Sequence, residues 1–389
     1  MNTKKVFKSL LVLNLLLVSL MLLTGCSIQT KDTTARASTK ETIKIGVVLP
    51  LTGPSADGGN YVKNGLLLAQ DELNKAEDNA DQDLAYHYEL LFQDSMYDPK
   101  TAVSAVRKLI DSDQVKYIVG AQGSSETLAI TPIAEENKVI LITPGSQSDK
   151  ISQAGDYIFR TQVNTAQESP FLAEHIFKAI GSKPLGLLLL NTDYGESMIN
   201  NFNPKFEAFG GKIAGIERFE PKDIDYRTQL TKLKGKDVQH ILIGGLRQNG
   251  GHIIKQAKEL GMQVRFFATS PIEGKELLEI AQEAAEGLEY AYPYDPEGTG
   301  KEEKEFMEKY KAVYGSENEM LSANGYDTLK ILSQCIEQEK SDVEKVKTCL
   351  YTIKEYAGAS GVFSLDQNGD AVKHMIIKTV KDKTFIKLK

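Results

Sequence analysis

The sequence predicts an α/β protein made of two doubly wound parallel sheets, each covered by helices on both faces. Three observations carry this prediction. Apolar strand segments alternate with amphipathic helical segments from Thr42 onward, and the same alternation starts again after Arg160. The strand segments are apolar along their whole length, which is typical of parallel strands buried on both faces. Helices must then cover both faces, so the pattern indicates two sheets in sequence.

The first alternation runs from Thr42 to Thr143. Its expected strands are Ile43–Leu49, Tyr88–Phe92, Tyr117–Val119 and Val139–Thr143, and its expected helices are Tyr61–Lys75, a helix that opens at Asp98-Pro99, and Ser125–Glu136. Asp98 suits the N-cap and Pro99 the first helical position. A cap side chain accepts a free backbone N–H, and proline has no N–H to lose.

The second alternation runs from Pro170 to Ala268. Its expected strands are Leu185–Leu190, Lys212–Phe219, His240–Ile243 and Val264–Ala268, and its expected helices are Pro170–Ile180, Gly195–Phe209, Tyr226–Leu233 and Gly251–Leu260. After Pro293 the expected elements are the helices Glu302–Tyr314, Tyr326–Glu337 and Asp342–Lys354 and the strands Gly361–Leu365 and Met375–Val380. Two such sheets create a cleft, and ligands of doubly wound sheets bind at the carboxyl ends of the strands.

The N-terminus has the parts of an export signal. Three lysines lie among the first eight residues, an apolar run extends from Leu10 to Leu23, and Leu23-Thr24-Gly25-Cys26 follows. The run is shorter than the about 20 residues of a membrane-spanning helix. The segment Leu23-Thr24-Gly25-Cys26 resembles the bacterial lipobox, whose cysteine is lipidated before the signal is removed. We expect residues 1–25 to be a lipoprotein signal peptide and Cys26 to be lipidated; the alternative is a signal peptide with an incidental cysteine.

Residues 26–41 are expected to form the lipidated cysteine and a flexible tether. The segment Ser27–Lys40 is polar and has no apolar period, and a coil of this length spans on the order of 20 Å. Several acyl chains bind a bilayer firmly, whereas one binds marginally. The expected location is therefore outside the cytoplasm, lipid-anchored to the cell membrane or to the periplasmic face of a bacterial envelope. The type of envelope stays open.

Length and charge narrow the class of protein further. Removal of residues 1–25 leaves 364 residues, which exceeds one ordinary core and predicts two domains. The mature chain has 43 basic and 53 acidic residues, hence a net charge of −10, and no basic block. Nucleic acid is therefore not an expected partner. The sequence has no second apolar run of membrane length, which excludes a sensor with its own transmembrane helix.

Two of the three cysteines remain after Cys26 is assigned to the lipid. Cys335 and Cys349 lie fourteen residues apart on two predicted helices joined by a turn near Lys340-Ser341. Antiparallel helices can bring these positions together, and an oxidising compartment favours a disulfide. We expect the Cys335–Cys349 bond; the alternative is two buried free thiols.

The sequence contains no motif for metal binding, phosphate binding or catalysis. The five histidines are widely separated and have no metal-ligand spacing. No G-x-S-x-G, Walker A or G-x-G-x-x-G motif follows a strand. We expect no cofactor, no metal and no catalytic residue, and a binding protein rather than an enzyme.

The mature chain resembles a known family over nearly its whole length. The motifs that carry the resemblance are Ile45-Gly46-Val47, Leu51-Thr52-Gly53-Pro54, Gly65, Asp98-Pro99, Gly120, Ile142-Thr143-Pro144, Tyr157–Arg160, Asp193-Tyr194-Gly195, Gly244-Gly245, Gln256–Gly261, Ala285-Glu286-Gly287, Gly325-Tyr326-Asp327, Gly361-Val362-Phe363 and Asn368-Gly369-Asp370. Their order and spacing resemble the type I periplasmic binding proteins of the branched-chain amino-acid (Leu/Ile/Val) receptor group, the substrate-binding components of ABC importers.

The resemblance implies two lobes joined by three crossovers, near Arg160, Tyr290 and Asp366. Lobe 1 would comprise residues 42–160 plus 292–366, and lobe 2 residues 161–291 plus 367–389. It also implies a monomer that closes over a small ligand at a hinge and presents the closed form to a membrane permease. A ligand closes the lobes only as far as it binds the closed form better.

In lobe 1 the resemblance places the ligand carboxylate at two segments. Gly123 and Ser124 open a predicted helix, where free N–H groups and the helix dipole favour an anion; the alternative is that Ser124 or Ser125 is only an N-cap. In the second segment Gly145 offers its backbone, and Ser146 or Ser148 offers a hydroxyl. Gln147 stands where the family has a threonine or serine. The alternative for this segment is an ordinary polar loop.

In lobe 2 one residue matches the family and two depart from it. Tyr194 matches the pocket tyrosine, whose ring can support an ammonium group or an apolar tail; the alternative is an exposed loop aromatic. Leu246 replaces a second pocket tyrosine. Ser270 stands where the amino-acid receptors have an acid that neutralises the ligand ammonium. Three nearby acids are candidates to replace that acid, namely Asp193, Glu273 and Asp295, and a loop shift of one or two residues is the other explanation.

The sequence thus predicts an exported solute-binding lipoprotein of an ABC importer, with an amino acid or a related small polar molecule as its ligand. A binder of a solute without the zwitterion (an amide, a carboxylate or a nucleoside) is one alternative. A receptor that presents its closed form to a signalling partner is another, and an extracytoplasmic hydrolase on the same scaffold is a third.

Overall fold

The structure, a computed structural model, describes residues 40–76, 84–295, 300–315 and 319–388. The predicted signal peptide, Cys26 and nearly all of the tether lie outside these residues. Within the described ranges, none of the helices is both long enough and apolar enough to cross a bilayer.

The first sheet has five parallel strands in the order β2-β1-β3-β4-β5. They are β1 (Glu41–Leu49), β2 (Tyr86–Asp94), β3 (Tyr117–Gly120), β4 (Ile140–Thr143) and β5 (Ile158–Arg160). Val47 at the centre of β1 pairs with Phe92 on one side and Val119 on the other. β3 and β4 are buried at every residue. Their continuous apolar runs therefore reflect burial on both faces.

Helices cover this sheet on both faces. They include α2 (Ala56–Ala76), α3 (Pro99–Arg107) and α4 (Ser124–Glu136). The predicted start of α3 is confirmed, because Asp98 Oδ1 accepts the Thr101 N–H at 2.8 Å and Pro99 is the first helical residue.

The second sheet has seven strands in the order β15-β14-β10-β9-β8-β6-β7. Five are parallel: β6 (Pro184–Leu190), β7 (Lys212–Phe219), β8 (His240–Gly244), β9 (Arg265–Ala268) and β10 (Glu289–Tyr292). The antiparallel pair β14 (Ile376–Lys381) and β15 (Thr384–Lys387) extends the sheet beyond β10. Its helices are α5 (Thr165–Ile180), α6 (Asp193–Ala208), α7 (Arg227–Lys234), α8 (Arg247–Glu259) and α9 (Lys275–Ala281).

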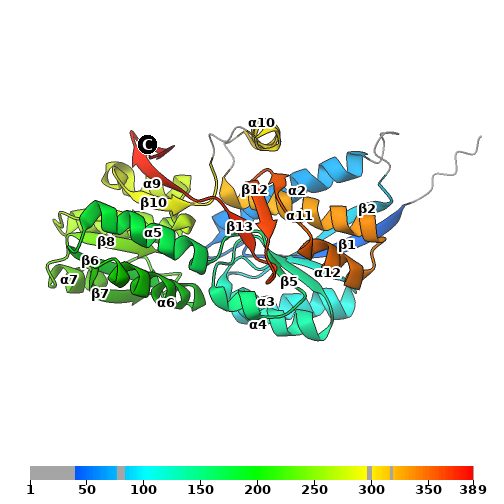
Figure 1. The fold of residues 1–389 in the computed structure, drawn as a ribbon, viewed down its shortest axis with the longest axis horizontal. Helices are drawn as coiled ribbons and strands as arrows, with labels where there is room; N and C mark the ends of the chain where they lie inside the picture. Colours follow the sequence, from blue (N-terminus) through cyan, green and yellow to red (C-terminus); the bar gives the residue numbers. More distant parts are fainter. Residues whose placement is uncertain (1–39, 77–83, 296–299, 316–318, 389) are drawn as a thin grey trace, which may run out of the picture. The chain divides into compact units, whose positions relative to one another are not determined.

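The chain then returns to the first sheet. This part comprises α10 (Lys301–Tyr314), α11 (Met320–Glu339), α12 (Val343–Tyr351) and a small antiparallel sheet of β11 (Tyr356–Gly358), β12 (Gly361–Leu365) and β13 (Ala371–Lys373). Helix α11 packs along α2. In Figure 1 the helices labelled α2, α3, α4, α11 and α12 lie with the five-stranded sheet, and those labelled α5, α6, α7 and α9 lie with the seven-stranded sheet. The predicted fold class is confirmed.

Of the three residues near which crossovers were predicted, Arg160 is the last residue of β5, Tyr290 lies within β10, and Asp366 precedes β13. The chain leaves the first sheet after β5, at Arg160, and returns after β10. The third passage was expected at Asp366. However, β13 still pairs with β12, and Asp370 forms an ion pair of 2.6 Å with the buried Arg160. These contacts keep the chain beside the first sheet as far as Lys373, so the passage to β14 follows that residue.

The sulfurs of Cys335 and Cys349 are bonded to each other, with Cα atoms 5.7 Å apart. Cys335 lies on α11 and Cys349 on α12, so the bond joins two consecutive helices.

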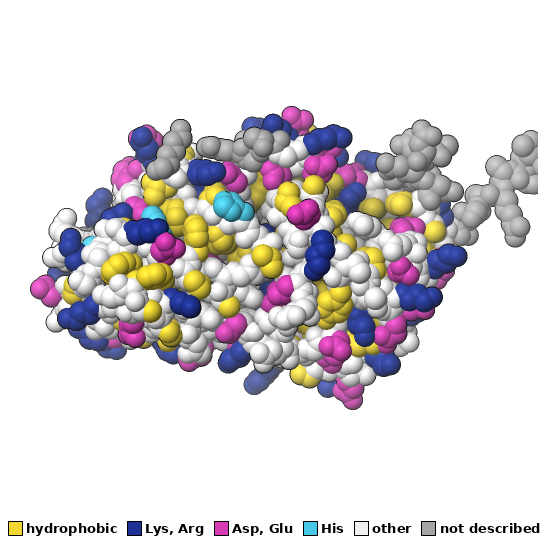
Figure 2. Space-filling model, viewed as in Figure 1, with side chains coloured by type: hydrophobic (Ala, Val, Ile, Leu, Met, Phe, Trp, Pro, Cys, Tyr) yellow, Lys and Arg dark blue, Asp and Glu magenta, His cyan; other side chains and the backbone are white. Residues whose placement is uncertain are grey.

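The face of the molecule in Figure 2 carries basic and acidic side chains in alternation, with apolar side chains between them. This mixture agrees with the mixed charges of the sequence, in which basic residues form no block. Mixed charges keep the local potential low, in contrast to the single-sign stripe that a polyanion requires.

Candidate ligand-binding site

A small cavity lies where elements of both sheets meet. Its volume is about 40 Å³, and its lining residues are Tyr97, Gln122, Gly123, Ser124, Gly145, Gln147, Gln162, Leu190, Tyr194, Leu246, Arg247, Pro271, Met320 and Leu321. Many of these residues follow the carboxyl ends of β3, β4, β6, β8 and β9, where doubly wound sheets bind ligands. Of the eight residues predicted for the site, all except Ser146 and Ser270 line the cavity.

The N-terminus of α4 forms one wall of the cavity. The backbone N–H groups of Ser124 and Ser125 donate to no group among the described residues, since they belong to the first helical turn. Ser124 Oγ accepts the N–H groups of Gln147 and Ser148, at 3.2 and 3.0 Å. The proton of the Ser124 hydroxyl therefore remains free to donate. This group of donors suits an anion.

Ser146 is turned away from the cavity. Its hydroxyl lies 2.6 Å from Thr127 Oγ1 and donates to the carbonyl of Gln122 at 3.0 Å. Both partners lie inside the first lobe, so Ser146 stabilises the loop after β4 and does not face a ligand. In strand-end loops neighbouring side chains point in different directions, and the sequence does not specify which one faces inward.

Gln147 links the two lobes through a buried carboxyl group. Its Nε2 donates to Glu168 Oε2 at 2.8 Å and to Ser270 Oγ at 3.0 Å. The Ser270 N–H donates to Glu168 Oε1 at 2.6 Å. Burial raises the pKa of Glu168 to about 7, against the hydrogen bonds from Ser270 and Gln147 that lower it. Ser270 thus lies beside an acid, although that acid comes from α5.

The three acids considered as substitutes are engaged elsewhere. Glu273 is ion-paired with Lys378 at 2.6 Å, Asp193 with Lys150 at 2.8 Å, and Asp295 with Lys387 at 2.5 Å. Among the described residues that line the cavity, none is an aspartate or a glutamate. The sequence analysis did not predict Glu168 as a site residue, although one feature of the sequence indicates that its side chain is buried. Glu168, Leu172 and Ile176 follow one another at helical spacing on the buried face of α5.

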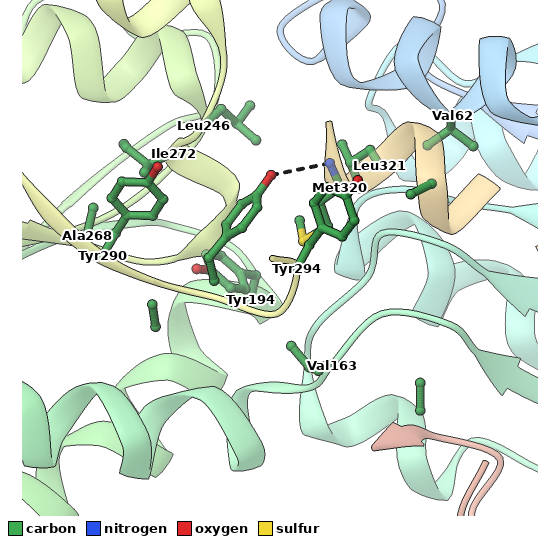
Figure 3. Packing of buried hydrophobic residues seen from close by; sticks show 14 of the residues in the cluster. Val62, Val163, Tyr194, Leu246, Ala268, Ile272, Tyr290, Tyr294, Met320 and Leu321 are labelled. Carbon is green, nitrogen blue, oxygen red and sulfur yellow. Dashed lines mark hydrogen bonds between the residues drawn. The ribbon is translucent and has the colours of Figure 1, made fainter. Parts of the chain in front are cut away.

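Tyr194 and Leu246 form part of an apolar wall. The Tyr194 hydroxyl donates to Thr269 Oγ1 at 2.6 Å, which fixes the ring at the start of α6. Figure 3 shows Tyr194 and Leu246 on one side, with Met320 and Leu321 on the other. The Met320 N–H donates to Tyr292 Oη at 3.3 Å. The cavity therefore combines polar donors at α4 with apolar side chains from both lobes.

Arg247 is the second residue that the sequence analysis missed. It is the first residue of α8, its side chain is 3 % exposed, and it is the one charged side chain among the described lining residues. Its Nε donates to the Glu273 carbonyl at 2.7 Å, and its Nη2 donates to Glu319 Oε2 at 2.8 Å. Its position just after β8 and the Gly244-Gly245 pair could have indicated a site residue, because such residues lie at the carboxyl end of a strand.

Two α/β lobes with a cavity at the carboxyl ends of their strands, bounded by a helix N-terminus and apolar side chains, define a bilobal solute-binding protein. A model of the periplasmic binding protein family matches residues 42–384. The chain belongs to this family. Membership confirms the resemblance inferred from the motifs.

Relatives and solved structures agree with this assignment. The leucine-, isoleucine-, valine-, threonine- and alanine-binding protein of Pseudomonas aeruginosa is 30% identical over 336 residues, which cover 85% of this chain and 87% of the relative. The leucine-binding protein LivK of Thermotoga maritima has a TM-score of 0.83 and 31% identity, over 89% of this chain and 98% of that chain. The substrate-binding protein LivJ of Streptococcus pneumoniae, solved with isoleucine, has a TM-score of 0.81 and 25% identity, over 90% and 100%.

Proposed function

We propose that this protein is the exported solute-binding subunit of an ABC importer and binds an amino acid, or a closely related small carboxylate, in the cavity between its lobes. The N-terminus of α4 carries this proposal. The N–H groups of Ser124 and Ser125 and the hydroxyl of Ser124 are three donors without acceptors among the described residues. A ligand carboxylate supplies those acceptors. One relative is named for binding leucine, isoleucine, valine, threonine and alanine, and another was solved with isoleucine, which supports the same ligand class.

The ammonium group of an amino acid needs acceptors, because leaving it desolvated without a partner is costly. Gln122 Oε1 is buried and has no hydrogen-bond partner among the described residues. Gln147 accepts no hydrogen bond at its Oε1 there, while its Nε2 is held by Glu168. We assign the ammonium to these two amide oxygens, with the Glu168 carboxyl group behind Gln147.

Ligand entry requires the lobes to separate. A cavity of about 40 Å³ has room for a few water molecules and is too small for an amino acid. Contacts between the lobes hold it shut, among them Ser125 Oγ to Asp193 at 2.9 Å and Lys150 to Asp193 at 2.8 Å. Hinge opening breaks these contacts, and a ligand that restores the closed form shifts the population toward it. The permease would then recognise the closed form.

The remaining features of the proposal concern partners and location. We place a membrane permease and its ATPase beside a monomer that the acyl chains on Cys26 hold at the membrane. Family membership and a site built of donors and apolar walls support binding without chemical change. The ligand should therefore be recovered unmodified after incubation with the protein.

A second candidate is a carboxylate without an ammonium group. It is favoured by one observation, namely that no acidic side chain is among the described residues lining the cavity. Comparing leucine, isoleucine and valine with the same compounds lacking the amino group separates the two candidates. Equal affinities would favour the second candidate, and a large loss without the amino group the first.

Ser124→Ala tests the carboxylate site. A hydrogen bond to a charged group is worth about 1.5–3 kcal/mol, so the dissociation constant for the tightest-binding ligand should rise about tenfold to hundredfold. Isothermal titration calorimetry measures it. Ser104→Ala is the matched control, because Ser104 lies on an exposed turn of α3 and its hydroxyl bonds only to the Lys100 carbonyl. Unchanged affinity in Ser124→Ala would remove the Ser124 hydroxyl from the site.

A further inference from the structure

A second and larger cavity lies behind Arg247. Its volume is about 670 Å³, and it is lined by residues of α2, α9, α10, β14 and β15 and by Glu319. The two cavities share no lining residue. Arg247 lines the small cavity, while Glu273 and Glu319, to which it donates, line the large one. Arg247 thus lies between the small cavity and two acceptors that line the large one, and we call its guanidinium the partition.

The partition is assembled from both lobes. Arg247 belongs to α8, which covers the seven-stranded sheet. Glu319, directly before α11, and Tyr61, on α2, belong to the lobe of the five-stranded sheet. Glu319 Oε2 lies 2.8 Å from Arg247 Nη2, and the guanidinium lies over the Tyr61 ring at 5.3 Å from its centroid. These contacts exist only when the lobes are together.

The surroundings of Arg247 are shaped to hold it in this place. Asp57 and Glu276 lie 3.9 Å from its Nε, on opposite lobes. A Cβ on Gly274 would lie 2.2 Å from Arg247 Nε, and a Cβ on Gly58 would lie 3.0 Å from its Nη1. Gly274 has an extended backbone with φ 161°, which any residue adopts. Glycine at this position therefore serves to leave space for the guanidinium.

We propose that Arg247 is a specificity-determining residue that sets the maximum length of the ligand. The inference rests on the proposed function, because it takes the α4 N-terminus as the fixed end of the ligand. The side chain of a ligand anchored there passes Leu246 and Leu321 and extends toward Arg247. A side chain that is too long keeps the guanidinium from reaching Glu319 and Tyr61, so the lobes cannot close on it. Closure of the lobes thus limits the length of the ligand side chain, and the ligand does not enter the large cavity.

The double substitution Arg247→Ala/Glu319→Gln tests this inference. It removes the partition and also neutralises the carboxylate that would otherwise lose its cation. Affinities are measured by calorimetry for straight-chain 2-amino acids of four to eight carbons. In the wild type the affinity should rise with length and then fall at the partition. In the variant it should continue to rise, by about fourfold for each methylene that enters the large cavity.

Two further variants keep the test decisive if the double variant folds poorly. Gly274→Ala displaces the guanidinium without removing a charge, and it should weaken the discrimination against long ligands in the same direction. Arg227→Ala is the control, because Arg227 forms exposed ion pairs with Asp225 and Glu259 and lies away from the cavities. It should leave the length profile unchanged.

The outcomes separate the two proposals. If the wild type and both Arg247-directed variants bind the series with the same length profile, Arg247 does not measure length, and the inference fails while the proposed function stands. If none of these proteins binds any member of the series, nor leucine, isoleucine, valine or the same compounds without the amino group, the proposed function fails and takes the inference with it.

Discussion

At the scale of single residues, the buried carboxyl group of Glu168 makes the stability of the protein depend on pH. Burial raises its pKa to about 7 from the ordinary value of 4.5. Between these two values the folded chain holds a proton that the unfolded chain has released. Stability therefore falls as the pH rises from about 4.5 to about 7, and the loss is complete above about pH 7.

Glu168→Gln should remove the share of this pH dependence that belongs to Glu168, about 3 kcal/mol between pH 4.5 and 7.5. Urea unfolding of the wild type and the variant at a series of pH values measures it. The dependence should shrink without vanishing, because burial also raises the pKa of Glu126 and of Glu319 to about 7. Glu174→Gln, at an exposed position of α5, is the matched control. Parallel curves for wild type and Glu168→Gln would contradict the assignment.

The sequence predicted part of the site, and the residues show why it predicted only part. Ser124 and Tyr194 were predicted from the family resemblance, and each lies in the first turn of a helix that follows a strand, where short motifs can be aligned. Glu168 and Arg247 reach the cleft region through contacts between the lobes, and no local pattern encodes such contacts. Ser146 and Ser270 sit in the right loops with their hydroxyls turned to other partners. Side-chain direction in a loop depends on packing that is absent from the sequence pattern.

At the scale of elements, the Cys335–Cys349 bond joins α11 to α12 across a loop of fourteen residues. A loop of about 15 residues contributes about 3 kcal/mol in the chain-entropy account. Reduction, or the double substitution Cys335→Ser/Cys349→Ser, should lower the free energy of unfolding by about that amount. In protein carrying Cys26→Ser, thiol titration of the denatured, unreduced chain should find no free sulfhydryl. Detection of two free thiols would contradict the disulfide.

The predicted strands and helices are present, but several helices begin earlier than expected. α2, α5, α8 and α11 start four to six residues before the predicted residue. Their first turns contain glycine or polar residues, as at Gly58 in α2 and at Gln248 in α8, which interrupt the apolar period. The strands β11 and β13 have three residues each, too short for a recognisable period. Because β13 was not anticipated, the third crossover was placed too early.

At the scale of the whole molecule, Cys26 should decide where the protein resides. Cys26→Ala removes the thiol that would carry the acyl chains, so the exported protein should leave the membrane fraction and lose incorporation of labelled fatty acid. Its affinity for ligand should not change, since the described lining residues all lie beyond position 96. A variant that stays in the membrane fraction with its label would place the anchor elsewhere.

The late return of the chain to the first sheet has a consequence for biogenesis. The five strands of that sheet end at Arg160, yet α11, which packs along α2, is not available until residue 339. β14 and β15 complete the second sheet only after residue 375. During synthesis the first sheet therefore lacks α11 until residue 339, and the second sheet lacks β14 and β15 until residue 387. A polypeptide that must cross a bilayer unfolded benefits from this delay, because its own connectivity postpones the folding of each lobe until these later segments have been delivered.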